Sequence, residues 1–130
     1  MLNELSVEET KKLVNEVYCV YRQFLFGDDE IDIKKDADKV TVKIKSMQNH
    51  IDIEYCISQT EWDSFISKLY DDIHINNWKT IYNPEKLMMM DGARWEIQIS
   101  FDGGEKRIYK GDNTYPYNWD DFTNLLVQFM

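Results

Sequence analysis

Residues 40–66, VTVKIKSMQNHIDIEYCISQTEWDSFI, carry the patterns that decide the fold. Apolar residues occupy every second position from Val40 to Ile44 and again from Ile51 to Ile57, a period of two that is typical of half-buried strands. The short polar stretch between the two runs predicts a turn, so the strands form an antiparallel hairpin. The turn length allows two registers, which set Lys43 opposite either Asp52 or Glu54 on the polar face.

A helix is predicted to follow the hairpin directly. Ser58-Gln59-Thr60-Glu61 has the form of a capping box, in which the serine and the glutamate satisfy each other's backbone N–H groups. The apolar residues behind it recur at helical spacing and form one stripe: Trp62, Phe65, Ile66, Leu69, Tyr70 and Ile73.

The N-terminal part of the chain shows a similar pattern. Ser6-Val7-Glu8-Glu9 is another capping box, and Leu13, Val17, Val20, Tyr21 and Phe24 recur at helical spacing behind it. We therefore expect one long helix that ends at Gly27, where positive φ is tolerated. An acidic edge strand is expected to follow it.

The C-terminal part predicts a second hairpin and a last helix. Trp95 to Phe101 alternate as a strand, and Asp102-Gly103-Gly104-Glu105 is a tight turn in which the glycines allow positive φ. The return strand, Lys106 to Lys110, is expected to place Ile108 across from Ile99. Asn118 is the predicted N-cap of the final helix.

The predicted order of elements is α-β-β-β-α-(β)-β-β-α. The short connections favour an antiparallel sheet, and strands with one polar face favour helices packed on the other face. We therefore predict a two-layer α+β fold that forms one domain over residues 1–130.

Charge is the strongest compositional signal. Asp and Glu number 24 against 15 Lys and Arg, for a net charge of −9 and a pI near 4.6. Because nucleic acids and anionic membranes attract clustered cations, this balance disfavours both and favours a partner with a basic surface. The first ten residues lack a signal-peptide pattern, and no apolar run has the length of a bilayer span, so a cytoplasmic location is expected.

Few residues suggest chemistry. His50 and His74 have no Cys, Ser or second His at motif spacing, and Cys19 and Cys56 have no metal-site spacing. Asp28, Glu30 and Asp32 alternate as in a calcium loop, but the glycine and closing glutamate of such a loop are missing. No glycine-rich phosphate motif occurs. We therefore predict no catalytic residues, no metal and no cofactor.

The segments DGARWEIQI (residues 91–99) and GDNTYP (residues 111–116) form a pattern D-G-x-x-W-x-I-x-I … G-x-N-x-Y-P. This pattern resembles one in small α+β proteins of Gram-positive bacteria and their mobile elements. The resemblance implies an α+β fold and a bacterial or phage origin. It implies no activity, since none is assigned to the pattern.

These observations favour an interaction protein over an enzyme. The leading hypothesis is a protein-binding or inhibitory protein, such as a toxin-immunity protein or a phage anti-defence factor of the anti-CRISPR kind, that engages the basic surface of a nucleic-acid-handling protein. The alternatives are a small metal-assisted hydrolase that uses carboxylates and a His, and a small-molecule sensor with a pocket at Trp95, Tyr115 and Tyr117. The predicted partner-binding residues are the following acids: Asp28, Asp29, Glu30, Asp32, Asp36, Asp38, Asp71, Asp72, Asp120 and Asp121.

Overall fold

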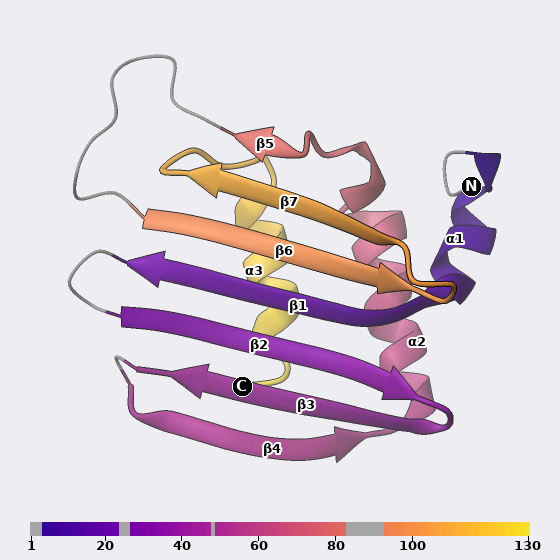
Figure 1. Cartoon of the computed structure of the whole chain (residues 1–130), viewed down its shortest axis with the longest axis horizontal. Helices are drawn as coiled ribbons and strands as arrows, with labels where there is room; N and C mark the ends of the chain where they lie inside the picture. The colour runs from indigo at the N-terminus through magenta and orange to yellow at the C-terminus, as the bar shows by residue number, and fades with distance from the viewer. Residues whose placement is uncertain (1–3, 24–26, 48, 83–92) are drawn as a thin grey trace.

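The fold is α+β, as the sequence predicts, and the described residues form a seven-stranded sheet (Figure 1). The structure is a computed structural model that describes residues 4–23, 27–47, 49–82 and 93–130. The strand order is β4-β3-β2-β1-β6-β7-β5.

The N-terminal helix is much shorter than predicted. Helix α1 spans Val7–Leu13 and opens with the expected capping box, but the chain then continues as strand β1, Val14–Gln23. The prediction of a helix up to Gly27 is therefore wrong: Gly27 begins strand β2, and residues 24–26 lie outside the described part. The expected order consequently lacks one strand, and that strand is the central one of the sheet.

A β-bulge explains why the apolar residues of β1 are spaced like those of a helix. The pairing of β1 with β6 shifts register between Val14 and Glu16, so Val14 and Val17 are both buried although they lie three positions apart. Val20, three positions further on, is also buried, but on the opposite face of the sheet, where it lies between Glu30 and Glu96. Burial at intervals of three resembles the period of a helix.

Strands β2 (Gly27–Asp36), β3 (Lys39–Ser46) and β4 (Ile51–Ile57) continue from β1 as an antiparallel meander. Of the two registers left open by the sequence, the structure has Lys43 opposite Glu54 and Lys45 opposite Asp52. The predicted hairpin is thus confirmed.

The predicted capping box at Ser58 is confirmed and opens α2, Gln59–Ser67. A π-helical turn, η2 (Lys68–Asp72), and a 3₁₀ turn, η3 (Ile75–Asn77), extend it. All six residues of the predicted apolar stripe are buried.

The remaining strands are β5 (Ile81–Tyr82), β6 (Ala93–Phe101) and β7 (Lys106–Asp112). The β6–β7 hairpin is confirmed, but Ile99 lies opposite Arg107 and Ile108 opposite Gln98, so the expected Ile99–Ile108 pair is wrong by one residue. That shift places Tyr109 in the core and leaves Ile108 exposed. The short β5 pairs parallel with β7, so the sheet is mixed where an antiparallel sheet was expected.

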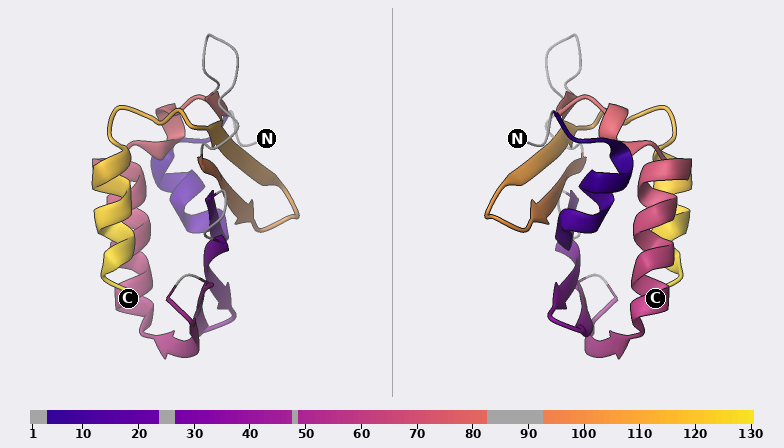
Figure 2. Two further views of the ribbon diagram at one scale, coloured as in Figure 1. Left: turned by 90° about the vertical axis from the view of Figure 1, so that its left-hand side faces the viewer. Right: turned by 90° about the vertical axis from the view of Figure 1, so that its right-hand side faces the viewer.

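Helix α3 spans Trp119–Val127 and lies beside α2 on one face of the sheet, while α1 lies at the end where β1 begins (Figures 1 and 2). No described helix covers the other face, which we call the open face. The core lies between the sheet and the α2–α3 layer and is built from alternate strand residues and the apolar helix stripes. None of the described helices is long and apolar enough to cross a bilayer.

Candidate binding surfaces

Strand β2 distributes the predicted acidic stretch over both faces of the sheet. Because side chains alternate along a strand, Asp28, Glu30 and Asp32 lie on the open face, whereas Asp29 faces the helical layer. Asp36 ends β2 opposite Lys39, and Asp38 lies in the turn that follows. The stretch is therefore not one negative surface.

Cations from neighbouring strands balance the acids of the open face. Lys43 and Lys45 of β3 lie opposite Asp32 and Glu30, and Arg22 of β1 forms an ion pair with Asp28 at 3.5 Å. The open face thus carries mixed charge.

One carboxyl group on this face has an unusual environment. Burial and the neighbouring Glu16 carboxylate raise the pKa of Asp32 to about 7, with Lys43 and Lys34 opposing the effect. The Asp32 Oδ1 atom is buried and has no hydrogen-bond partner among the described residues. Next to it, the Tyr18 hydroxyl donates a hydrogen bond to Glu30.

Asp29 marks the polar end of an apolar groove on the helical side. The Ser46 hydroxyl donates a hydrogen bond of 2.5 Å to Asp29 Oδ1 and accepts one of 3.3 Å from the backbone N–H of Asn49. The groove has a volume of about 310 Å³ and lies between α3 and strands β1 to β4. Its apolar walls include Ile31, Ile44, Ile51 and Ile53 from the sheet and Phe122, Leu126, Val127 and Met130 from the C-terminal segment.

Several exposed apolar side chains gather where this groove opens. Ile51 and Ile53 are 39% and 45% exposed, and Val127 and Met130 are 58% and 71% exposed. The Tyr55 hydroxyl bonds to the backbone carbonyl of Phe129, which fixes the end of the C-terminal segment beside β4. An apolar patch at the rim of an apolar groove is typical of a binding site.

The groove was not predicted, because strand alternation alone places the apolar positions of β4 in the core. The groove arises from the position of β4 at the end of the described sheet, and that position depends on how the strands pair in three dimensions.

The helical layer places the other predicted acids at one of its ends. Asp71 and Asp72 end η2, while Asp120 and Asp121 lie in the first turn of α3. The Asn118 side chain joins these two places, since its Nδ2 donates a hydrogen bond of 2.7 Å to the carbonyl of Ile73. The two aspartate pairs therefore occupy the same end of the layer.

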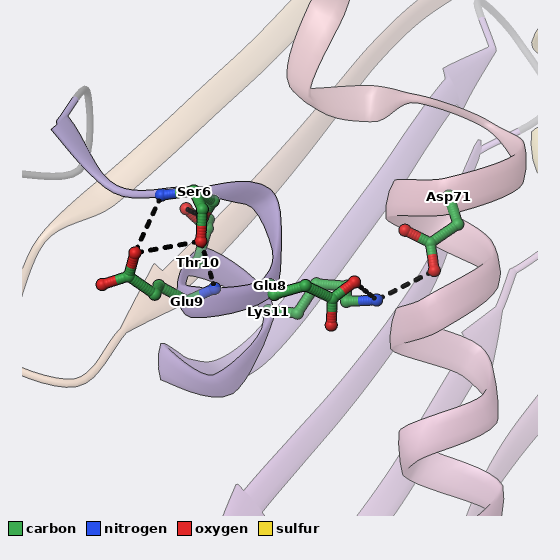
Figure 3. A network of polar contacts seen from close by, with 6 residues as sticks. All are labelled: Ser6, Glu8, Glu9, Thr10, Lys11 and Asp71. Atoms are coloured by element: carbon green, nitrogen blue, oxygen red, sulfur yellow. Dashed lines mark hydrogen bonds and ion pairs between the residues drawn. The ribbon is translucent and has the colours of Figure 1, made fainter.

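One of these four acids, Asp71, already forms an ion pair. The ammonium group of Lys11 in α1 contacts Asp71 Oδ2 at 2.8 Å and Glu8 at 2.8 Å (Figure 3). The hydrogen bond to Asp71 is the largest cause that raises the pKa of Lys11, and the hydrogen bond to Glu8 is the second. Asp72, Asp120 and Asp121 have no ion pair within the part of the chain that the structure describes.

Within the described part of the chain, the three residues of the predicted aromatic pocket have different surroundings. Trp95 is buried and donates a hydrogen bond of 2.9 Å to the carbonyl of Thr114, and Tyr115 packs on Trp119 and shares a hydrogen bond of 3.1 Å with the Tyr21 hydroxyl. Tyr117 is 92% exposed and lines a separate hollow of about 370 Å³ beside Trp78, Tyr82 and Pro116.

The histidines and cysteines are placed as follows. His50 lies in the β3–β4 turn and His74 just after η2, both exposed and both at positive φ. Cys19 is buried, which raises its thiol pKa, and Cys56 is exposed on β4. Among the described residues no three His, Cys, Asp or Glu side chains gather as a metal site would require.

Neither a known protein family nor a curated protein matches this sequence. The resemblance of residues 91–116 to small Gram-positive bacterial proteins therefore stays a prediction, and residues 91 and 92 of that pattern lie outside the described part.

Proposed function

We propose that this chain is an acidic protein-binding domain that engages a basic surface of a partner protein through the α2–α3 layer. The observation that carries the proposal is the contrast in charge between the two sides of the molecule. On the open face, acids alternate with Lys34, Lys43, Lys45, Arg22, Arg94, Lys106 and Lys110. The α2–α3 layer, from Ser58 to Lys79 and from Asn118 to Met130, holds Glu61, Asp63, Asp71, Asp72, Asp120 and Asp121 against only Lys68 and Lys79.

Unpaired surface carboxylates of one sign create a field that steers an oppositely charged protein into contact. Asp72, Asp120 and Asp121 suit this role because they are exposed and lack a cation within the described residues. Nucleic-acid-handling proteins present basic surfaces of this kind, so an inhibitory or immunity role against such a protein remains the proposed biological setting.

The test compares two double variants with the same change in charge. Asp72→Lys with Asp121→Lys alters the helical layer, and Asp36→Lys with Asp38→Lys alters the end of β2 and the turn that follows. Each protein is used to capture partners from a bacterial lysate, and the bound proteins are eluted with a salt gradient. We expect the wild type and the Asp36/Asp38 variant to retain a basic protein that elutes as salt rises, and the Asp72/Asp121 variant to lose it by about tenfold or more.

Equal retention by both variants, or capture that is insensitive to salt, would count against this function. Circular dichroism of each variant before capture separates loss of binding from loss of fold.

A further inference from the structure

We propose that the outer edge of β4 and the adjoining apolar groove bind an extended segment of a partner protein in which apolar residues alternate with Lys or Arg. The segment would add to the sheet as an eighth strand. This site uses the C-terminal end of α3, whereas Asp120 and Asp121 lie in the first turn of that helix, and it goes beyond the function proposed above.

β4 offers an open sheet edge. It is the terminal strand of the described sheet, is seven residues long, contains no proline and pairs with β3 without a register shift. Its outward N–H and C=O groups therefore stand in line, which is the arrangement that strand addition requires. The other edge strand, β5, has only two residues.

The helix-facing side of β4 is apolar and incompletely covered. Ile51 and Ile53 are 39% and 45% exposed, and they form the rim of the 310 Å³ groove together with Val127 and Met130. An added strand would place every second side chain over this rim, so apolar residues at those positions would cover surface that is now in contact with water.

The opposite side of β4 is acidic. Asp52 and Glu54 alternate with Ile51, Ile53 and Tyr55, and they point to the open face. On its inner edge β4 already pairs with a strand of the complementary pattern, because β3 sets Lys45 opposite Asp52 and Lys43 opposite Glu54, with Ile44 opposite Ile53. The charge pattern of β4 thus selects basic residues in a strand that joins its outer edge.

The same pattern disfavours a second copy of this chain. If two β4 strands paired with their apolar sides aligned, Asp52 and Glu54 of one copy would face the same acids of the other. Like charges on opposing strand positions are destabilising, so the structure favours a foreign basic strand over self-association.

β3 supplies the probe for a direct test. A synthetic peptide with the sequence of residues 39–46, which carries three lysines between apolar residues, is labelled with a fluorophore and titrated with the full protein. We expect saturable binding by fluorescence anisotropy. We also expect slowed hydrogen exchange at every second backbone amide of residues 51–57, because antiparallel pairing engages alternate N–H groups.

Matched variants locate the site. Ile53→Lys places a charge on the groove rim and should weaken peptide binding by about tenfold or more. Ile108→Lys changes an isoleucine of similar exposure, 42%, on β7 and should leave binding unchanged. A peptide with its three lysines replaced by glutamate should bind about tenfold more weakly or worse.

The proposal fails if the peptide does not bind at millimolar concentration, or if it binds without protecting β4 amides. It also fails if Ile53→Lys and Ile108→Lys change the peptide affinity equally. A further contrary result would be self-association of the protein that already protects the β4 amides from exchange without peptide. The Asp72→Lys and Asp121→Lys variant should bind the peptide normally, so loss of partner capture by that variant and loss of peptide binding by Ile53→Lys are independent results.

Discussion

The indole Nε1 of Trp78 donates a hydrogen bond of 3.0 Å to the side-chain oxygen of Asn118, and both residues are buried. Asn118 was expected to cap α3 with its side chain, and it is indeed the N-cap residue, but its amide makes no capping hydrogen bond. The amide instead joins Trp78 to the carbonyl of Ile73, and so connects α3 with the segment after η2.

Replacing Asn118 should therefore destabilise the fold more than the loss of a helix cap would. Asn118→Ala leaves the Trp78 N–H and the Ile73 carbonyl without their partner, and we expect a loss of about 2–4 kcal/mol in the free energy of unfolding. Urea denaturation followed by tryptophan fluorescence measures it. Asn124→Ala, an exposed asparagine in the same helix, should change the unfolding free energy by less than about 0.5 kcal/mol.

Asp32 should make the unfolding free energy depend on pH. Its pKa is about 7 in the folded protein and near 3.8 in the unfolded chain, so the folded state binds the proton more tightly. Asp32 therefore contributes to the free energy of unfolding at low pH, and this contribution is lost as pH rises from about 3.8 to about 7.

Asp32→Asn cannot ionise and should gain stability relative to wild type as pH rises from 5 to 8. Urea denaturation at several pH values in that range measures the difference. Asp38→Asn, in the exposed β2–β3 turn, is the matched control and should follow the wild-type profile. A constant difference between Asp32→Asn and wild type over this range would contradict the assignment.

Gly111 lies directly against the Trp95 indole. A Cβ atom at this position would meet Trp95 Nε1 at 2.3 Å and the Thr114 carbonyl oxygen at 2.5 Å, which are the two atoms of one hydrogen bond. Gly111→Ala should therefore displace the indole and reduce stability by about 1–3 kcal/mol, with a shift in tryptophan emission.

Gly103→Ala is the control for that substitution. A Cβ there meets no atom within 4 Å, although φ is +95°. Backbone strain should lower stability by about 1 kcal/mol and leave tryptophan emission unchanged.

The ion pair between Lys11 and Asp71 should hold α1 locally and add little to global stability. Because water reaches about half of the Asp71 side chain (48% exposed), and because Met keeps the apolar stem of Lys11, Lys11→Met should change the unfolding free energy by less than about 1 kcal/mol. Hydrogen exchange of the amides in Val7–Leu13 should nevertheless become faster, since the helix loses its contact with η2. Lys12→Met, its exposed neighbour, should leave both measurements unchanged.

Elements with one clear period could be predicted from the sequence. The β3–β4 and β6–β7 hairpins, both capping boxes and the α2 stripe follow from alternation, turn glycines and Ser-x-x-Glu spacing, and all are present. β1 was missed because its bulge spaces Val14 and Val17 as a helix would. Its valines and tyrosines, which favour strands, were the signal against a helix.

The candidate sites were harder to predict because they depend on which strands become neighbours. Asp28 and Asp29 are adjacent in sequence but lie on opposite faces of β2, whereas Asp72 and Asp121 reach the same end of the helical layer only when α3 packs beside η2. The groove depends on β4 being the terminal strand, which no local pattern specifies.

The central position of β1 has a consequence for how the chain acquires its structure. β1 pairs on one side with β2, its neighbour in sequence, and on the other with β6, which begins only at Ala93. During synthesis from the N-terminus, a ten-residue strand of high β-propensity therefore keeps one unpaired edge until β6 has been made. The nascent protein is most exposed to chaperones and to aggregation in that interval, and any fragment that ends before β6 keeps the same exposed edge permanently.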